Sequence, residues 1–308
     1  MNYKSIFNLL GILLGIFSLS FIPPLVLTFV YRESGMEIFL YSFIFFSILG
    51  SSLWAATRQQ NLPLNISDGF IITTLFWVVL ACAGSIPFYF FGLSISDSVF
   101  ESVSGITTTG ATTIIGLDNL PKSILFYRQL LQWIGGMGLI ILAVAVMPAL
   151  GIGGGQLYKM ELPGSHGNQK LTPKITDSAK ALWKIYVGLT LICAILYLSS
   201  GMDLFDSIAH SLSTVAGGGF STHDQSIGFF NSSLIEAVCI VFMLLSAASF
   251  AVHYVAIFGG KPLKYFYDSE FRFFLSVIML IILISFMVHL VNNSFTDIFS
   301  TFGSTIFQ

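Results

Sequence analysis

Seven long apolar runs divide the chain, and each is long enough to cross a lipid bilayer as a helix. They cover residues 7–30, 38–56, 70–91, 124–150, 182–198, 234–258 and 271–291. About 20 apolar residues cross the hydrocarbon layer as a helix, and lipid offers the backbone no hydrogen-bond partners, so such a run must pair its own amides. Charged residues make up only 9% of the chain, against about 25% in soluble domains. The sequence therefore predicts an all-α integral membrane protein.

The positive charges predict the orientation of these helices. Cytoplasmic loops of membrane proteins carry more lysine and arginine than external loops. The basic loops follow the second, fourth and sixth runs, with Arg58, Lys159, Lys170, Lys174, Lys180, Lys261 and Lys264. We therefore expect the N-terminus in the cytoplasm and the acidic segments 92–123 and 199–233 outside, where they would concentrate cations. A net charge of −2 gives no attraction to nucleic acid.

The middle of the chain repeats itself with an offset of 109 residues. Asp-Ser-Val at 97–99 matches Asp-Ser-Ile at 206–208, Gly110 matches Gly219, and a threonine follows three positions later in both copies. Each copy consists of an apolar span, a short amphipathic stretch, a glycine-centred turn and a second span. We expect an N-terminal helix pair at 1–60, a first repeat at 61–160, a cytoplasmic loop and second repeat at 161–264, and the start of a third repeat at 265–308.

The two glycine-centred turns are the candidates for chemistry. They read SGITTTGATT at 104–113 and STVAGGGFST at 213–222, and each follows a stretch able to form a short helix, 98–105 and 207–214. A short polar segment between two spans is typical of a re-entrant loop, whose irregular backbone is tolerated where it lines a water-filled cavity. Potassium filters hold the dehydrated ion with rings of backbone carbonyls, and glycine gives the backbone the freedom to aim them. The pattern favours helix–pore loop–helix units around a potassium pore.

The titratable residues near the spans give a weaker indication of function than the two turns do. His210 and His223 flank the second turn on its outer side and are candidates for sensing external pH. Ser246 and His253 are the one nucleophile–base pair that an intramembrane enzyme could use, two turns apart on a helix. The sequence also leaves open a non-conducting fragment and a sodium/potassium carrier working by alternating access. The carrier would need inverted repeats, whereas an even number of spans separates these two.

Several segments closely resemble the TrkH family of bacterial Trk potassium uptake systems, within the Trk/Ktr/HKT superfamily. Residues 104–112 resemble the first filter of that family, and residues 213–224 resemble the second. GGQLYK at 154–159 and LTPKI at 171–175 resemble its cytoplasmic signature. The resemblance covers essentially the whole chain, and the two extra N-terminal spans favour TrkH within the superfamily.

The resemblance implies four filter-bearing repeats around one pore in the bacterial cytoplasmic membrane, a homodimer, a cytoplasmic TrkA-type nucleotide-binding regulatory subunit, and no cofactor. The chain ends before the third and fourth filters, so we expect it to be truncated relative to this plan. By position, the resemblance assigns ion contacts to Thr108, Thr109, Gly110, Gly217, Gly218 and Gly219, with Thr107 and Ala216 as additional filter positions.

Overall fold

The structure, a computed structural model, describes residues 3–58, 66–146 and 175–291, and every described element is a helix. This confirms the predicted all-α fold. The cytoplasmic loop expected around 151–174 and the residues after 291 lie outside the described part. The elements are α1 (Tyr3–Ser18), η1 (Leu19–Phe21), α2 (Ile22–Tyr31), α3 (Met36–Thr57), α4 (Ile66–Phe91), α5 (Ile95–Ile106), η2 (Leu117–Asn119), α6 (Lys122–Val146), α8 (Ile175–Ser199), α9 (Leu204–Ala216), η4 (Ser226–Phe230), α10 (Ser233–Ala247), α11 (Phe250–Ile257), α12 (Lys264–Tyr267) and α13 (Ser269–Val291).

Five helices in the described ranges are long and apolar enough to cross a membrane. They are Tyr3–Tyr31, Met36–Thr57, Ser67–Phe91, Lys180–Ser199 and Ser269–Val288. The first combines α1, η1 and α2, and it changes geometry where Pro23 and Pro24 occupy the first turn of α2, because proline has no amide to donate. The fourth predicted span is the single long helix α6, which carries polar side chains among its apolar ones.

The prediction of one continuous helix for the sixth span, 234–258, is wrong. It is divided into α10 and α11 at Ala248, whose backbone is extended (φ −73°, ψ 140°). Ser249 then caps α11, its hydroxyl accepting the amide of Val252. The carbonyl of Leu245, left without its helical partner, accepts the amide of Ala248 at 3.1 Å and faces His253 Nε2 at 2.9 Å. These local partners satisfy the backbone where the helix is interrupted.

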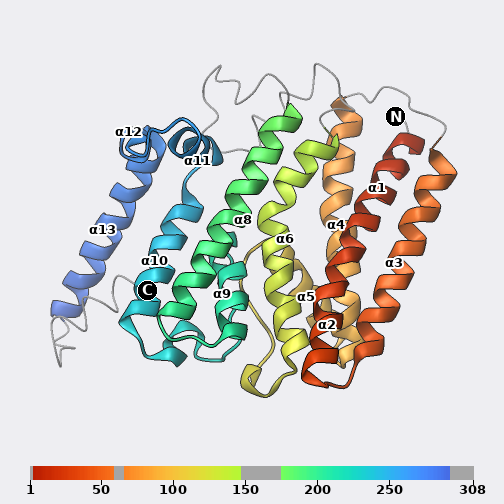
Figure 1. Cartoon of the computed structure of the whole chain (residues 1–308), viewed down its shortest axis with the longest axis horizontal. Coiled ribbons are helices and arrows are strands. Elements are labelled where there is room, and N and C mark those ends of the chain that lie inside the picture. The colour runs from red at the N-terminus through yellow and green to blue at the C-terminus, as the bar shows by residue number, and fades with distance from the viewer. Residues whose placement is uncertain (1–2, 59–65, 147–174, 292–308) are drawn as a thin grey trace.

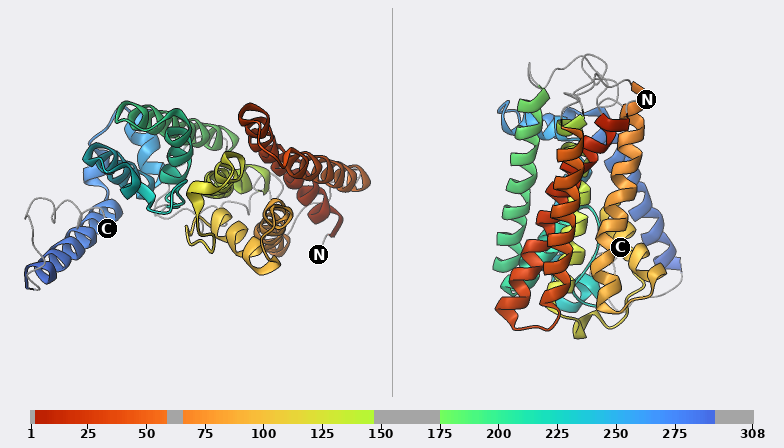
Figure 2. Two further views of the ribbon diagram at one scale, coloured as in Figure 1. Left: turned by 90° about the horizontal axis from the view of Figure 1, so that it is seen from below. Right: turned by 90° about the vertical axis from the view of Figure 1, so that its right-hand side faces the viewer.

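The long helices run side by side, with the start of α1 and the short helices α11 and α12 at one end of the molecule and η2 and the connection between α2 and α3 at the other (Figure 1). Seen from that second end, α6 lies between the N-terminal helices and the second repeat, and α13 extends away at one side (Figure 2). Helix α13 makes few contacts with the other helices, and only 6% of its apolar stretch is buried.

Helix α6 joins two hydrophobic cores. Tyr127 and Leu131 pack into the core of the N-terminal helices and the first repeat, where Tyr127 contacts the rings of Phe39 and Phe88. Met137, further along the same helix, packs into the core of the second repeat. Because α6 packs against α2, α5, α8 and α9, both short helices are positioned on one shared scaffold.

Candidate functional site

Two capped short helices, α5 and α9, lead into the glycine-centred turns. Each begins three residues before the predicted stretch because a side chain satisfies its first amides. Ser94 Oγ accepts the amide of Asp97 at 3.1 Å, and Asp203 Oδ1 accepts the amide of Asp206 at 2.6 Å. These are favourable N-cap residues, and they occupy equivalent positions in the two repeats. The turns follow the C-terminal ends of α5 and α9, where the helix dipole is partly negative.

The two turns share one backbone conformation. Thr108 (φ 54°) and Gly217 (φ 66°) are left-handed at equivalent positions, and two residues later so are Gly110 (φ 78°) and Gly219 (φ 84°). A left-handed conformation costs residues other than glycine about 1–2 kcal/mol, and a β-branched residue rarely adopts it. Thr108 is therefore a strained position, which the surrounding structure must stabilise.

The structure places the additional positions Thr107 and Ala216 at the helix ends rather than inside the turns. Thr107 is the C-cap of α5, and its amide bonds the carbonyl of Val103 at 2.8 Å. Ala216 is the last residue of α9. The six other predicted ion contacts, Thr108, Thr109, Gly110, Gly217, Gly218 and Gly219, all lie in the two turns.

The backbones of the two turns meet each other. A Cβ atom added to Gly110 would collide with the carbonyl oxygen of Gly218. The two turns are closed by equivalent hydrogen bonds of 2.9 Å, from the amide of Thr109 to Ser104 O and from the amide of Gly218 to Ser213 O. Backbone oxygens therefore lie where the turns approach, and such oxygens can replace the water around a cation.

A buried arginine of α6 contacts both loops just beyond the turns. Arg128 Nε lies 3.2 Å from Glu101 Oε2, and both side chains are fully buried. Arg128 Nη2 donates to Thr112 Oγ1, and Nη1 donates to the carbonyl of Ser221, each at 3.0 Å. The guanidinium carbon also lies 4.3 Å from the ring centroid of Phe220. One side chain therefore links the first repeat to the second.

Glu101 and His210 occupy equivalent positions and hold equivalent segments. Glu101 Oε1 accepts the hydroxyl of Thr112 and, at 2.7 Å, the amide of Thr113. His210 Nε2 lies 2.9 Å from the hydroxyl oxygen of Ser221. Glu101 was predicted in an acidic outer segment and His210 on the outer flank of the second turn, but both are buried inside short helices. The short helix of each repeat thus holds the segment that follows its own turn.

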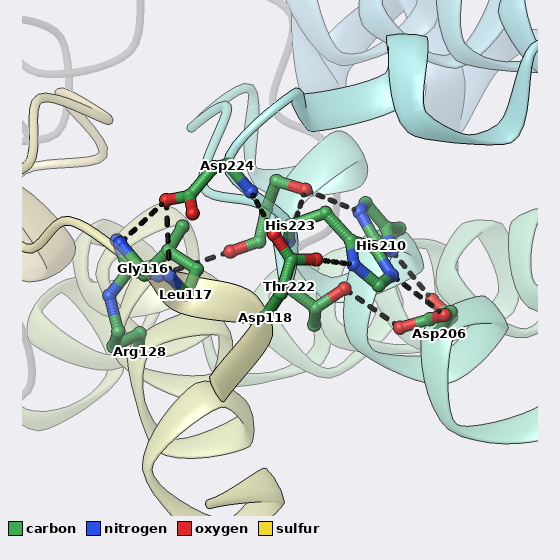
Figure 3. A network of polar contacts seen from close by, with 10 residues as sticks. Gly116, Leu117, Asp118, Arg128, Asp206, His210, Thr222, His223 and Asp224 are labelled. Carbon is green, nitrogen blue, oxygen red and sulfur yellow. Dashed lines mark hydrogen bonds and ion pairs between the residues drawn. The ribbon is translucent and has the colours of Figure 1, made fainter. Parts of the chain in front are cut away.

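A second polar network connects the loops that follow the two turns (Figure 3). Thr222 Oγ1 donates to Asp206 Oδ1 at 2.7 Å, and His223 Nε2 lies 3.2 Å from Asp206 Oδ2. The other ring nitrogen of His223 contacts Asp118 Oδ1, in the loop of the first repeat. This hydrogen bond from His223 holds the pKa of the exposed Asp118 carboxyl below its usual value.

Asp224 adds a second connection between these loops. Its Oδ1 accepts the amides of Gly116 at 3.0 Å and Leu117 at 3.1 Å. Gly116 is left-handed (φ 81°), which turns two successive amides toward one carboxylate oxygen. The loops of the two repeats are therefore bound together by side chains beyond the turns and by backbone contact at the turns themselves.

Two glycines of α6 allow this helix to touch the end of each short helix. A Cβ added to Gly135 would collide with the carbonyl oxygen of Ile106, the last residue of α5. A Cβ added to Gly136 would lie 3.1 Å from the Cβ of Ala216, the last residue of α9. Small residues permit such close helix packing in membranes.

The nucleophile–base pair that an intramembrane enzyme would need is not formed. His253 Nδ1 lies 2.6 Å from the hydroxyl of Tyr265, and its Nε2 faces the carbonyl of Leu245. The hydroxyl of Ser246 donates to the carbonyl of Met243 at 2.7 Å. These partners give His253 a structural role at the end of α10.

Comparison with known proteins gives the family. Residues 35–307 match TrkH, described as a cation transport protein. The chain belongs to the TrkH family. It is 45% identical over 313 residues to the Trk system potassium uptake protein TrkH of Vibrio parahaemolyticus, and 44% identical over 312 residues to that of Escherichia coli K12. These alignments cover 100% of this chain and 64% of each relative.

The fold agrees with the same family. The crystal structure of the potassium transporter TrkH from Vibrio parahaemolyticus superposes with a TM-score of 0.87 at 43% identity, covering 100% of this chain and 63% of that one. The chain is thus a multi-pass membrane protein. The TrkH family to which it belongs consists of cation transport proteins, not enzymes. It spans just under two thirds of the length of these relatives.

The sequence analysis missed the residues that hold the turns together. Neither Arg128 nor Glu101 is among the predicted site residues, although Glu101 lies within the acidic segment 92–123. Ionisable residues within a membrane span are costly and are usually functional. Applied to the run at 124–150, that rule would have singled out Arg128.

Proposed function

We propose that this chain forms part of the pore of a Trk-type potassium uptake protein in the bacterial cytoplasmic membrane. The observation that carries the proposal is the pair of matched turns. Both have left-handed residues at the same two positions, and their backbones meet at Gly110 and Gly218. An ion can be held by carbonyl oxygens only where the backbone leaves helical geometry, and both turns do so at the end of a short helix.

In this proposal, Thr108, Thr109 and Gly110 of the first turn and Gly217, Gly218 and Gly219 of the second supply oxygens to the ion. Thr107 and Ala216 would border the same path at the helix ends. A potassium ion that loses its water shell is stabilised by several carbonyl dipoles, and the partly negative ends of α5 and α9 add to this stabilisation. Small or absent side chains keep the backbone accessible.

The whole transporter is proposed to contain more than these two turns. Two turns approach an ion from one side, and the relatives are longer than this chain, so further turns of the same kind would complete the ring. We propose an N-terminal helix pair at 1–60, a first repeat at 61–160, a cytoplasmic loop and second repeat at 161–264, and the start of a third repeat at 265–308. We also propose a cytoplasmic N-terminus, a homodimer and a TrkA-type cytoplasmic regulatory subunit. The basic loops and the family of the chain support this arrangement.

The experiment is growth of a bacterium that lacks its own potassium uptake systems. The gene product that includes any sequence following Gln308 should restore growth in low potassium and should take up rubidium. The 308-residue chain alone should not, because two turns leave the ring open. Full-length protein that reaches the membrane but neither restores growth nor takes up rubidium would contradict the proposal.

A further inference from the structure

We propose that Arg128 is a positioning residue that fixes the two turns relative to each other and thereby sets the preference for potassium over sodium. This inference rests on the proposed function. Its starting point is that Arg128 reaches Thr112 and Ser221, which occupy equivalent positions in the two repeats. Each lies two residues beyond the left-handed glycine of its turn, at Gly110 and Gly219.

The shape of the arginine side chain makes this link rigid. A guanidinium is a planar fork whose donors point in fixed directions. In Arg128 one branch donates to the hydroxyl of Thr112, the other donates to the carbonyl of Ser221, and Nε faces Glu101. The ring of Phe220 packs against the same group. Because the nitrogens are fixed relative to one another, neither loop can shift without breaking a buried contact.

A second side chain of α6 supports the same segment. Gln132 lies one helical turn after Arg128, and its Oε1 accepts the amide of Phe220 at 3.0 Å. A Cβ on Gly218 would collide with the Gln132 side chain. Helix α6 of the first repeat therefore holds two consecutive residues of the second loop, immediately after Gly219.

The carboxylate of Glu101 compensates the buried positive charge of Arg128. An unpaired buried cation beside a cation path would repel the ion and would be costly to bury. Glu101 is fully buried against Arg128 and supplies the opposite charge. The pair can therefore position both turns while adding no net charge near them.

Selectivity is the property that this geometry would control. Discrimination between potassium and sodium depends on the spacing, number and field of the coordinating oxygens. A small displacement of one turn against the other would alter that spacing and leave the chain folded. Loss of the link should therefore change which ion is taken up more than how much protein reaches the membrane.

The test is Arg128→Lys in the full gene product, measured as rubidium uptake with and without excess sodium at equal membrane expression. Lysine keeps the charge opposite Glu101, but its compact ammonium lacks the planar fork that holds Thr112 and Ser221 at a fixed spacing. We expect the preference for rubidium over sodium to fall by about tenfold, equivalent to about 1.4 kcal/mol. If this variant fails to accumulate, Thr112→Val carries the same test, because it removes the hydroxyl that joins this loop to both Arg128 and Glu101 and keeps the shape of the side chain.

The matched control is Trp133→Phe on the same helix. Trp133 Nε1 donates to Thr190 Oγ1 at 3.0 Å, so this variant loses a contact between helices without touching either turn, and it should keep the native preference. Normal discrimination in the accumulating Arg128 or Thr112 variant would overturn the inference. An equal loss in Trp133→Phe would also overturn it, because the effect would then be general destabilisation. Absence of selective rubidium uptake by the native protein would instead refute the proposed function.

Discussion

Substituting alanine for each of the two equivalent glycines should separate backbone strain from contact between the turns. Both Gly110 (φ 78°) and Gly219 (φ 84°) are left-handed, so alanine should cost about 1–2 kcal/mol at either position. Around Gly219 an added Cβ meets nothing within 4 Å, whereas at Gly110 it collides with the carbonyl oxygen of Gly218. Gly110→Ala therefore carries the same strain and also forces the two turns apart.

The assay combines thermal unfolding of the purified full-length protein in detergent with rubidium uptake at equal membrane expression. Gly219→Ala should lower stability and reduce uptake moderately. Gly110→Ala should lower uptake further and let sodium compete, because the collision displaces an oxygen of the partner turn. Gly228→Ala is the control, since its backbone is not left-handed and its added Cβ meets nothing within 4 Å. Equal effects of the substitutions at Gly110 and Gly219, or normal discrimination in Gly110→Ala, would refute this reasoning.

Three further predictions concern the topology, the start of α6 and the carboxylate of Asp118. In a variant without native cysteines, Gly228→Cys should react with an impermeant thiol reagent from outside and Leu263→Cys only from the cytoplasm; labelling from one side would contradict the orientation. Glu33 accepts two amides at the start of α6, at 2.6 and 3.1 Å, so Glu33→Ala should cost about 0.5–2 kcal/mol in thermal unfolding, as for other lost helix caps. The lowered pKa of Asp118, caused by His223, means that its contribution to stability is present above the unfolded pKa of about 3.9 and is lost as pH falls through the folded value. Asp118→Asn should therefore have a lower unfolding temperature than the native protein at neutral pH, and the two unfolding temperatures should be equal in strong acid. A difference in unfolding temperature that stays constant at all pH values would contradict this.

The sequence predicted the parts of the fold that depend on hydrophobic length and on duplication. Apolar runs located the spans because the bilayer imposes a minimum length, and the constant offset located both turns. Hydropathy could not detect the interruption at Ala248, because small apolar residues fit a continuous helix as well as an interrupted one. Ser249 was the available signal, since a serine at that position can cap a new helix.

The contacts between repeats could not be derived from sequence positions. Arg128 and Ser221 lie far apart in the chain, and their bond uses a backbone carbonyl that no side-chain pattern reveals. The meeting of Gly110 with Gly218 is likewise a backbone contact. The sequence could indicate that both turns are candidate ion-binding segments. Their placement relative to each other depends on how α6 packs between α5 and α9.

The different side chains at the two equivalent positions have a consequence for exchanging repeats. Glu101 pairs with Arg128 of α6, a cation that also bonds the second repeat at the carbonyl of Ser221, whereas His210 bonds the hydroxyl of Ser221 and the carbonyl of Asp206 within its own repeat. At this position the first short helix is therefore linked through Arg128 to the second repeat, whereas the second short helix is held within its own repeat. A chimera that inserts the second short helix in place of the first would leave Arg128 without its carboxylate, while the reverse exchange would bury an uncompensated glutamate. The two halves are alike in backbone but are no longer interchangeable parts.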